Sequence, residues 1–148
     1  MSITNENAEL AAAAASKFLK GNIPDEELKS CIDTIKLNSG SNAISTYGSY
    51  ICAVFYWRVS LNANGKQFTG NAGGVGGVGG GSTNGDIYLA DGVTFDELVS
   101  LTASFQFNGA IAYLNVNFFS SSSKYLGSFH GGGIATCAGT GGGTGSWS

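Results

Sequence analysis

Hydrophobic and polar residues alternate along residues 102–119, which is the pattern of two half-buried strands. One face of each strand is apolar and comprises Ala103, Phe105, Phe107, Ala112, Leu114, Val116 and Phe118. Asn108-Gly109 stands between the two runs and suits a two-residue type I′ turn, because both central residues of that turn need positive φ. The pattern therefore predicts a β-hairpin that turns at Asn108-Gly109.

Residues 44–60 carry the longest strand signal, dense in aromatic and β-branched side chains. Gly48 is expected to mark a bend or bulge in this strand. Strict alternation places five side chains on one face: Ile51, Ala53, Phe55, Trp57 and Val59. Because Cys52, Val54 and Tyr56 on the other face are apolar too, we expect a helix to cover one face. The predicted core comprises Phe55, Trp57, Phe105, Phe107, Leu114, Val116 and Phe118.

Helical patterns precede these strands. Residues 7–20 form an alanine-rich run of high helix propensity that should end at Gly21. A second helix should begin after Ile23, with acids in its first turn and an apolar stripe of Leu28, Cys31, Ile32 and Ile35. A short third helix is expected over residues 94–101, where Thr94 and Glu97 form a T-x-x-E capping box.

The remaining segments read as strands joined by turns at Asn64-Gly65 and Asp91-Gly92. Counting residues 44–60 as one bent strand or two gives seven or eight antiparallel strands. A closed barrel is the expected arrangement, since closure leaves no exposed strand edge.

Glycine gathers in residues 73–81, 131–133 and 139–145. Residues 74–79 match G-x-G-x-x-G, but a strand signal follows them, so close strand contact or a turn is favoured over phosphate binding. If a barrel brings the three segments together, their bare backbone forms a flat, uncharged contact surface. Its candidate residues are Gly73, Gly74, Gly76, Gly77, Gly131, Gly132, Gly133, Gly141 and Gly142. The alternative is that glycine relieves crowding where coiled strands cross.

Charge and cysteine content narrow the candidate partners. A net charge of −3 without a basic cluster predicts neither nucleic acid nor anionic lipid headgroups as a partner. The three cysteines have no C-x-x-C spacing, and buried free thiols are the favoured interpretation. No stretch approaches the roughly 20 apolar residues of a membrane span, and the N-terminus lacks the basic start of a signal peptide.

Catalytic chemistry has few candidates in this sequence. His130 and the cysteines lack metal-ligand spacing, so no metal and no cofactor are expected. Cys137 with His130 is a conceivable nucleophile and base, but a buried thiol and a surface or strand-end histidine are favoured. The sequence has no P-loop, no G-x-S-x-G elbow and no evident carboxylate pair, and it predicts no enzyme.

Residues 94–147 closely resemble the C-terminal half of the virulence-associated (Vap) proteins of pathogenic rhodococci. The features come in the same order: a short helix, SFQFN, LNVNFF, a serine-rich turn, LGSF and GGGTGSW. A looser resemblance extends back to residue 42. It implies an all-β fold, a closed eight-stranded antiparallel β-barrel over residues 41–148 with one short inserted helix, a filled interior and no obvious ligand cavity. Residues 1–40 would form a helical N-terminal extension without a match in this resemblance.

The resemblance also implies a secreted or host-delivered virulence factor linked to lipid membranes, with no assigned catalytic residues. A cytoplasmic location is the alternative, because no signal peptide is recognised. Two functional classes remain open. The favoured one is an effector-type protein that binds a host membrane lipid or a host protein. The other is a small-ligand or glycan-binding barrel with Tyr50, Tyr56, Trp57 and Tyr113 lining a site. Eight strands enclose either packed side chains or one small ligand, and the many bulky apolar residues favour packing.

Overall fold

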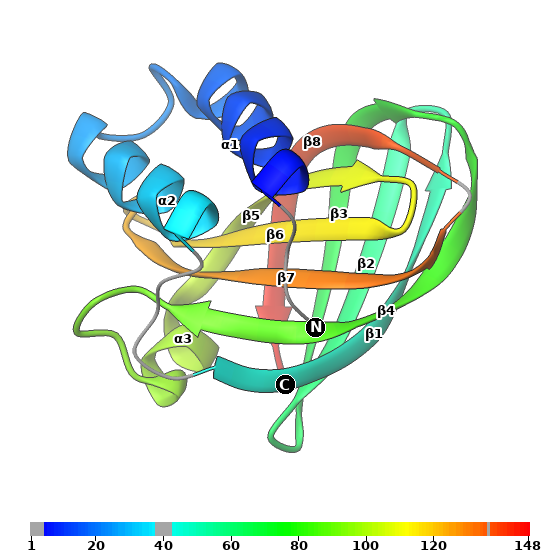
Figure 1. Ribbon diagram of the computed structural model, residues 1–148. Coiled ribbons are helices and arrows are strands. Elements are labelled where there is room, and N and C mark those ends of the chain that lie inside the picture. The colour runs from blue at the N-terminus through cyan, green and yellow to red at the C-terminus, as the bar shows by residue number, and fades with distance from the viewer. Residues whose placement is uncertain (1–4, 38–42, 136) are drawn as a thin grey trace.

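The computed structural model describes residues 5–37, 43–135 and 137–148 of the 148-residue chain. The helices are α1 (Asn5–Leu19), α2 (Asp25–Leu37) and α3 (Phe95–Leu101). The strands are β1 (Ala43–Ala53), β2 (Tyr56–Ala63), β3 (Lys66–Gly76), β4 (Val78–Leu89), β5 (Thr102–Ala110), β6 (Tyr113–Ser120), β7 (Tyr125–Ala135) and β8 (Gly139–Trp147). They form a closed antiparallel barrel in the order β1-β2-β3-β8-β5-β6-β7-β4, which confirms the predicted fold class (Figure 1).

The strand order separates β3 from β4, because the β1–β2 hairpin lies between them. The chain passes round the tip of that hairpin at Gly77. There the Val54 amide donates to the Gly77 carbonyl at 3.1 Å, and the Gly76 amide donates to the Val54 carbonyl at 2.9 Å. The glycine-rich residues 73–81 thus form the end of β3, the crossover at Gly77 and the start of β4. This agrees with the prediction that these glycines allow close contact between strands.

Aromatic side chains fill the barrel interior. The Phe68 ring meets the edges or faces of Phe105 and Phe118 at centroid distances of 5.4 and 5.1 Å, and the Trp57 and Phe107 centroids are 4.3 Å apart. All five side chains are buried. Six of the seven residues of the predicted core are therefore confirmed, and the exception is Phe55.

The prediction for Phe55 is wrong because residues 44–60 are two strands, not one. Val54 and Phe55 form the turn between β1 and β2, with Val54 at φ +61°. The turn reverses the alternation, so Tyr50 and Cys52 of β1 are buried where strict alternation would expose them. Phe55 is 69% exposed at the tip of the hairpin.

The predicted β5–β6 hairpin is confirmed, but the predicted position of its turn, Asn108-Gly109, is wrong. Ala110 pairs with Tyr113, so Ile111 and Ala112 make the turn. Asn108 remains in the strand because its amide is buried and hydrogen-bonded to neighbouring polar side chains. Gly109 remains beside it because a Cβ there would lie 3.1 Å from the Trp57 ring.

Local signals elsewhere predicted the structure well. Asn64 and Gly65 have φ of 48° and 77°, which confirms the turn between β2 and β3. Thr94 caps α3, and its hydroxyl accepts from the Glu97 amide at 3.1 Å while Glu97 Oε1 accepts from the Thr94 amide. Gly48 makes no bulge, because the register is continuous through it; a Cβ at that position would overlap the Ser60 backbone.

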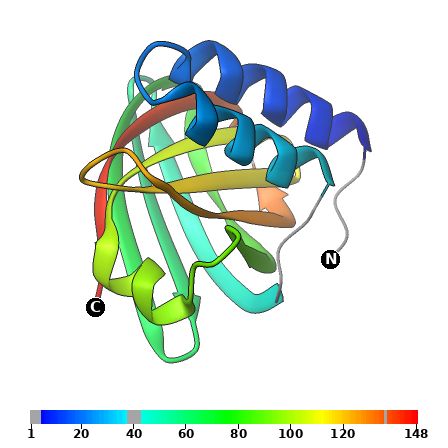
Figure 2. The ribbon, with the colours of Figure 1, turned by 90° about the vertical axis from the view of Figure 1, so that its left-hand side faces the viewer.

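The helices α1 and α2 pack against each other and cover the outer wall formed by β5 and β7 with β6 between them (Figure 2). All eight residues of β6 are buried, because one face points into the barrel and the other lies beneath the helices. The expectation that a helix covers residues 44–60 is wrong, since Ile51 and Tyr56 are exposed on the outside of the barrel. The docking face of α1 is made mainly of alanines: Ala8, Ala11, Ala12 and Ala15, with Leu19.

Candidate functional site

The nine glycines of the predicted contact surface lie on three strands and one link. In β3 and β8, Gly73 pairs with Gly142 and Gly74 with Gly141, so two of the three segments are neighbours. Residues 131–133 belong to β7, which β5 and β6 separate from β8. The structure therefore brings the first and third segments together along β3 and β8. At its other end the first segment meets β7, because Gly81 of β4 pairs with Ala135, two residues beyond Gly133.

Packing explains several of these glycines. A Cβ at Gly76 would lie 2.9 Å from the Trp57 ring, and one at Gly131 would overlap the Phe129 ring. A Cβ at Gly141 would overlap the Gly73 backbone. Gly73 and Gly77 differ, because a Cβ at either position has no atom within 4 Å and both residues are exposed. Gly133 is exposed as well, but a Cβ there would overlap the Ser82 backbone, so the exposed positions with open space around them lie where β3 ends.

Exposed hydrophobic side chains gather at that same end of the barrel. Residues 54–55, 77, 111–112 and 137–138 lie between successive strands there, since Ala53 pairs with Val78 and Gly139 pairs with both Gly76 and Gly109. Figure 1 shows the described links together at the right-hand side. We define the apolar end as Val54, Phe55, Val78 and Ile111. The last three expose 69%, 71% and 77% of their surface.

The links at the two ends of the barrel differ in charge. The sequence places no charged residue in the four links that meet there. The opposite end holds the β2–β3 and β6–β7 turns and α3. The charged residues in or beside those elements are Lys66, Asp91, Asp96, Glu97 and Lys124. Arg58 lies on the barrel wall opposite Ile51 in the β1–β2 register. The two ends of the barrel thus present different chemistry.

A disulfide between Cys52 and Cys137 fastens β1 to the residues between β7 and β8. The interpretation of all three cysteines as free thiols is wrong for this pair. Barrel closure brings the two sulfurs together across 85 residues, and sequence spacing carries no trace of that contact. Cys31 remains a free, buried thiol in α2, and burial raises its pKa above the ordinary value. A thiol held in its neutral form is a poor nucleophile.

The outer wall beneath the helices carries a buried network of amides and hydroxyls. We call it the polar wall. It comprises the buried Gln106, Asn108, Asn115, Asn117 and Ser128, with the exposed Thr140 at its edge. Asn108 donates to Asn115 Oδ1 at 2.8 Å, and Asn117 donates to Gln106 Oε1 at 2.7 Å. Ser128 donates to Asn117 Oδ1 at 2.6 Å. Because these groups satisfy one another, they tolerate burial under the alanine face of α1.

His130 and Tyr113 extend this wall. The Tyr113 hydroxyl and His130 Nδ1 are 3.0 Å apart, while His130 Nε2 has no hydrogen-bond partner among the described residues. The expected surface or strand-end histidine is wrong, since His130 lies within β7 and is 2% exposed. Burial lowers the pKa of its imidazole to about 3 and raises the pKa of the Tyr113 phenol. Both groups are therefore neutral across the physiological range.

The buried imidazole makes stability depend on pH. Between the folded pKa of about 3 and the unfolded pKa of about 6.5, the unfolded chain binds a proton that the folded chain excludes, so stability falls as pH falls. From pH 6.5 to 5.5 we expect His130 to contribute a loss of about 1 kcal/mol in the free energy of unfolding. Urea unfolding at the two pH values should show that His130→Gln loses less stability than the wild type by this amount. Equal losses would show that His130 is not held neutral.

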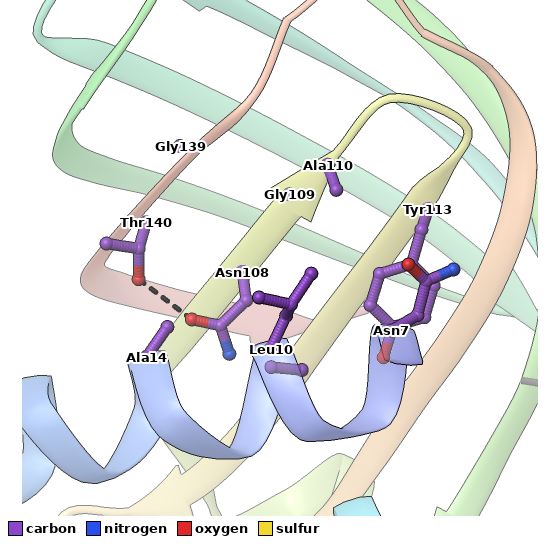
Figure 3. A pocket seen from close by; sticks show the side chains of 10 residues that line it. Asn7, Leu10, Ala14, Asn108, Gly109, Ala110, Tyr113, Gly139 and Thr140 are labelled. Atoms are coloured by element: carbon purple, nitrogen blue, oxygen red, sulfur yellow. Dashed lines mark hydrogen bonds between the residues drawn. The ribbon is translucent and has the colours of Figure 1, made fainter. Parts of the chain in front are cut away.

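A groove lies between α1 and the β5–β6 hairpin, beside the polar wall (Figure 3). Its volume is about 370 Å³. Leu10 and Ala14 line it from the helix, and Asn108 and Ala110 line it from β5. No sequence pattern predicts this groove, because it forms only where the helix meets the barrel.

The four aromatic residues of the alternative ligand site do not surround one space. Tyr50 and Trp57 stack inside the barrel, with ring centroids 5.8 Å apart. Tyr56 is exposed and donates from its hydroxyl to Asn71 Oδ1 at 2.6 Å. Tyr113 lies on the outer wall beside α1. A ligand site inside the barrel lined by all four is therefore wrong.

The candidate nucleophile and base are likewise not assembled, because Cys137 is held in a disulfide. Within residues 5–37, 43–135 and 137–148, no group of three or more histidine, cysteine, aspartate or glutamate side chains is placed to hold a metal ion. None of the helices described has the length and apolar character needed to cross a membrane.

Comparison with known proteins supplies the family. The model of the Rhodococcus equi virulence-associated protein family matches residues 2–148 and thus includes both N-terminal helices. The solved structure of VapB from the intracellular pathogen Rhodococcus equi is 35% identical and superposes with a TM-score of 0.65, covering 72% of this chain and 96% of that one. VapD from the same organism is 34% identical, with a TM-score of 0.68 and coverage of 72% and 97%. No curated protein matches the chain. The chain belongs to the Rhodococcus equi virulence-associated protein family.

Proposed function

We propose that this protein acts without catalysis, by binding a host lipid membrane through its apolar end. The observation that carries the proposal is the exposure of Phe55 and Ile111 on uncharged links at one end of the barrel, together with that of Val78 at the start of β4. Single exposed apolar side chains are ordinary on soluble proteins, but neighbouring ones at one end of a barrel indicate a contact surface.

The expected strength of this contact follows from its composition. Full burial of one large apolar side chain contributes about 1.5 to 3 kcal/mol, so a few such residues suffice for reversible binding to a bilayer. Because the links carry no charge, the binding should depend little on salt and should not require anionic lipids. A surface held by basic residues would behave in the opposite way.

The glycine surface enters the proposal through Gly73 and Gly77. Both are exposed and have open space around them, so a lipid surface can approach the backbone closely beside Phe55 and Val78. Delivery outside the cytoplasm is part of the same proposal. The Cys52–Cys137 disulfide supports it, because disulfides persist mainly in oxidising compartments.

Liposome flotation tests this function. The wild-type protein should bind neutral phosphatidylcholine vesicles, and raising NaCl from 0.1 to 0.5 M should change the partition coefficient by less than about twofold. Phe55→Asp should reduce that coefficient by at least about tenfold, since a charge replaces an exposed apolar side chain that the bilayer would bury. Leu101→Asp is the matched control, because Leu101 is 43% exposed on α3 at the opposite end.

Three results would contradict membrane binding. They are no binding to neutral vesicles, binding that disappears at high salt, and equal losses in the two aspartate variants. If the wild type binds no vesicles but does bind a host protein, and Phe55→Asp loses that protein, then the apolar end binds a protein partner instead.

A further inference from the structure

The groove beside α1 has an apolar lining and a polar edge of Asn108 and Thr140, and the polar side chains of Asn7 and Tyr113 line it as well. Leu10 and Ala14 face it from the helix and Ala110 from the end of β5, while the buried Asn108 and the exposed Thr140 form its polar edge (Figure 3). Its volume of about 370 Å³ falls within the roughly 300 to 1,000 Å³ of typical small-molecule sites. The described residues that line it include no charged side chain.

The polar edge has spare hydrogen-bonding capacity at Thr140. Asn108 is fully engaged, because its Oδ1 accepts from both Gln106 and Thr140 and its Nδ2 donates to Gln106 and Asn115. The Thr140 hydroxyl donates its one proton within the wall and accepts one bond, from Gln106 at 3.2 Å. A hydroxyl oxygen accepts two hydrogen bonds, so Thr140 retains one acceptor site for a ligand donor.

The position of the groove indicates how a ligand enters. Ala110 is followed directly by Ile111, which is 77% exposed at the apolar end. Leu10 is 59% exposed on the helical side. A molecule that partitions to apolar surfaces therefore meets exposed hydrocarbon before it reaches the polar edge.

We propose that this groove binds the hydrocarbon chain of an uncharged single-chain amphiphile, such as a monoacylglycerol. The chain lies against Leu10, Ala14 and Ala110, and a head-group hydroxyl donates to Thr140. A carboxylate or phosphate head has no cationic partner in the groove, and Thr140 donates its one proton within the polar wall, so an anionic head binds more weakly. The site is distinct from the lipid contact at Phe55 and Val78, because its ligand is a single dissolved molecule.

Isothermal titration with 1-monolauroylglycerol below its micelle concentration tests the site. We expect one molecule per chain and binding at least tenfold weaker for laurate. Ala14→Trp should weaken monolauroylglycerol at least tenfold, because the indole fills the groove. Ala13→Trp is the matched control, since Ala13 is exposed on the adjacent face of the same helix and does not line the groove. Thr140→Val should weaken monolauroylglycerol several-fold without filling the groove.

Each outcome separates this site from the proposed membrane contact. Phe55→Asp should bind monolauroylglycerol within twofold of the wild type, even when it no longer binds vesicles. Absence of wild-type binding, equal affinity for laurate, or unchanged affinity in both Ala14→Trp and Thr140→Val would overturn the proposal. Far-ultraviolet circular dichroism and thermal unfolding establish whether each variant is folded. If Ala14→Trp does not fold, Thr140→Val provides the test.

Discussion

Phe118→Ala is expected to lower the free energy of unfolding by about 3 to 5 kcal/mol, because truncation of a buried phenylalanine leaves a cavity as well as losing apolar contact. The Phe118 side chain is fully buried inside the barrel. Its ring contacts Phe68 at a centroid distance of 5.1 Å and Trp147 at 5.8 Å. Three strands therefore lose contacts at once, and urea unfolding at neutral pH measures the loss.

Phe55→Ala is the matched control, since Phe55 is the same residue type in an exposed hairpin turn. Its free energy of unfolding should stay within about 0.5 kcal/mol of the wild type. A loss below about 1 kcal/mol for Phe118→Ala would show that the barrel interior is not packed as described.

The contrast between these two phenylalanines shows what alternation predicts. In β5 and β6 the apolar face is correct although the turn is misplaced from Asn108-Gly109 to Ile111-Ala112, because alternation within each strand does not depend on where the turn lies. In β1 and β2 the alternation is interrupted by a turn at Val54 and Phe55 that the sequence analysis did not recognise. The face of β1 predicted to lie with Trp57 and Val59 is therefore the exposed one. Val54 adopts a left-handed φ that β-branched residues rarely take, so the turn had no sequence signal.

The sequence shows the amides of the polar wall on one face of a hairpin, but alternation alone does not tell whether that face is buried or exposed. Gln106 and Asn108 on one strand, and Asn115 and Asn117 on the next, share the face opposite the phenylalanines. A face of amides normally predicts solvent exposure. Here their mutual hydrogen bonds permit burial, and the small alanines of α1 allow the helix to approach closely.

The packing of the N-terminal helices determines whether the domain boundary predicted at residue 40 separates two independent units. The solved VapB and VapD chains match 72% of this chain over 96% and 97% of their own length, so the remainder of this chain has no counterpart in those solved chains. In this chain, however, Ala15 and Ile35 belong to the same buried cluster as the barrel. Independent folding of residues 41–148 stays a prediction. The groove beside α1 was beyond sequence reasoning for the same reason, because it exists only where the two parts pack.

Removing the Cys52–Cys137 disulfide is expected to lower the free energy of unfolding by about 2 to 5 kcal/mol, because the bond closes a loop of about 85 residues in the unfolded chain. Thermal unfolding of the Cys52→Ala/Cys137→Ala double variant measures the loss. Dithiothreitol should lower the melting temperature of the wild type and leave that of the double variant unchanged. Cys31 is present in both proteins, so an effect of reductant on its free thiol cancels in the comparison.

Loss of the disulfide should destabilise the apolar end more than the rest of the barrel. Cys52 lies next to the β1–β2 turn at that end, and the bond joins it to the chain between β7 and β8. Hydrogen exchange should therefore quicken first at the amides of Val54 and Gly76, which bond across the β1–β2 hairpin tip, and last at the Gln67 amide of the opposite end. Uniform quickening would mean that the bond stabilises the barrel as a whole. A double variant as stable as the wild type would instead show that strand pairing alone holds the two sulfur atoms together.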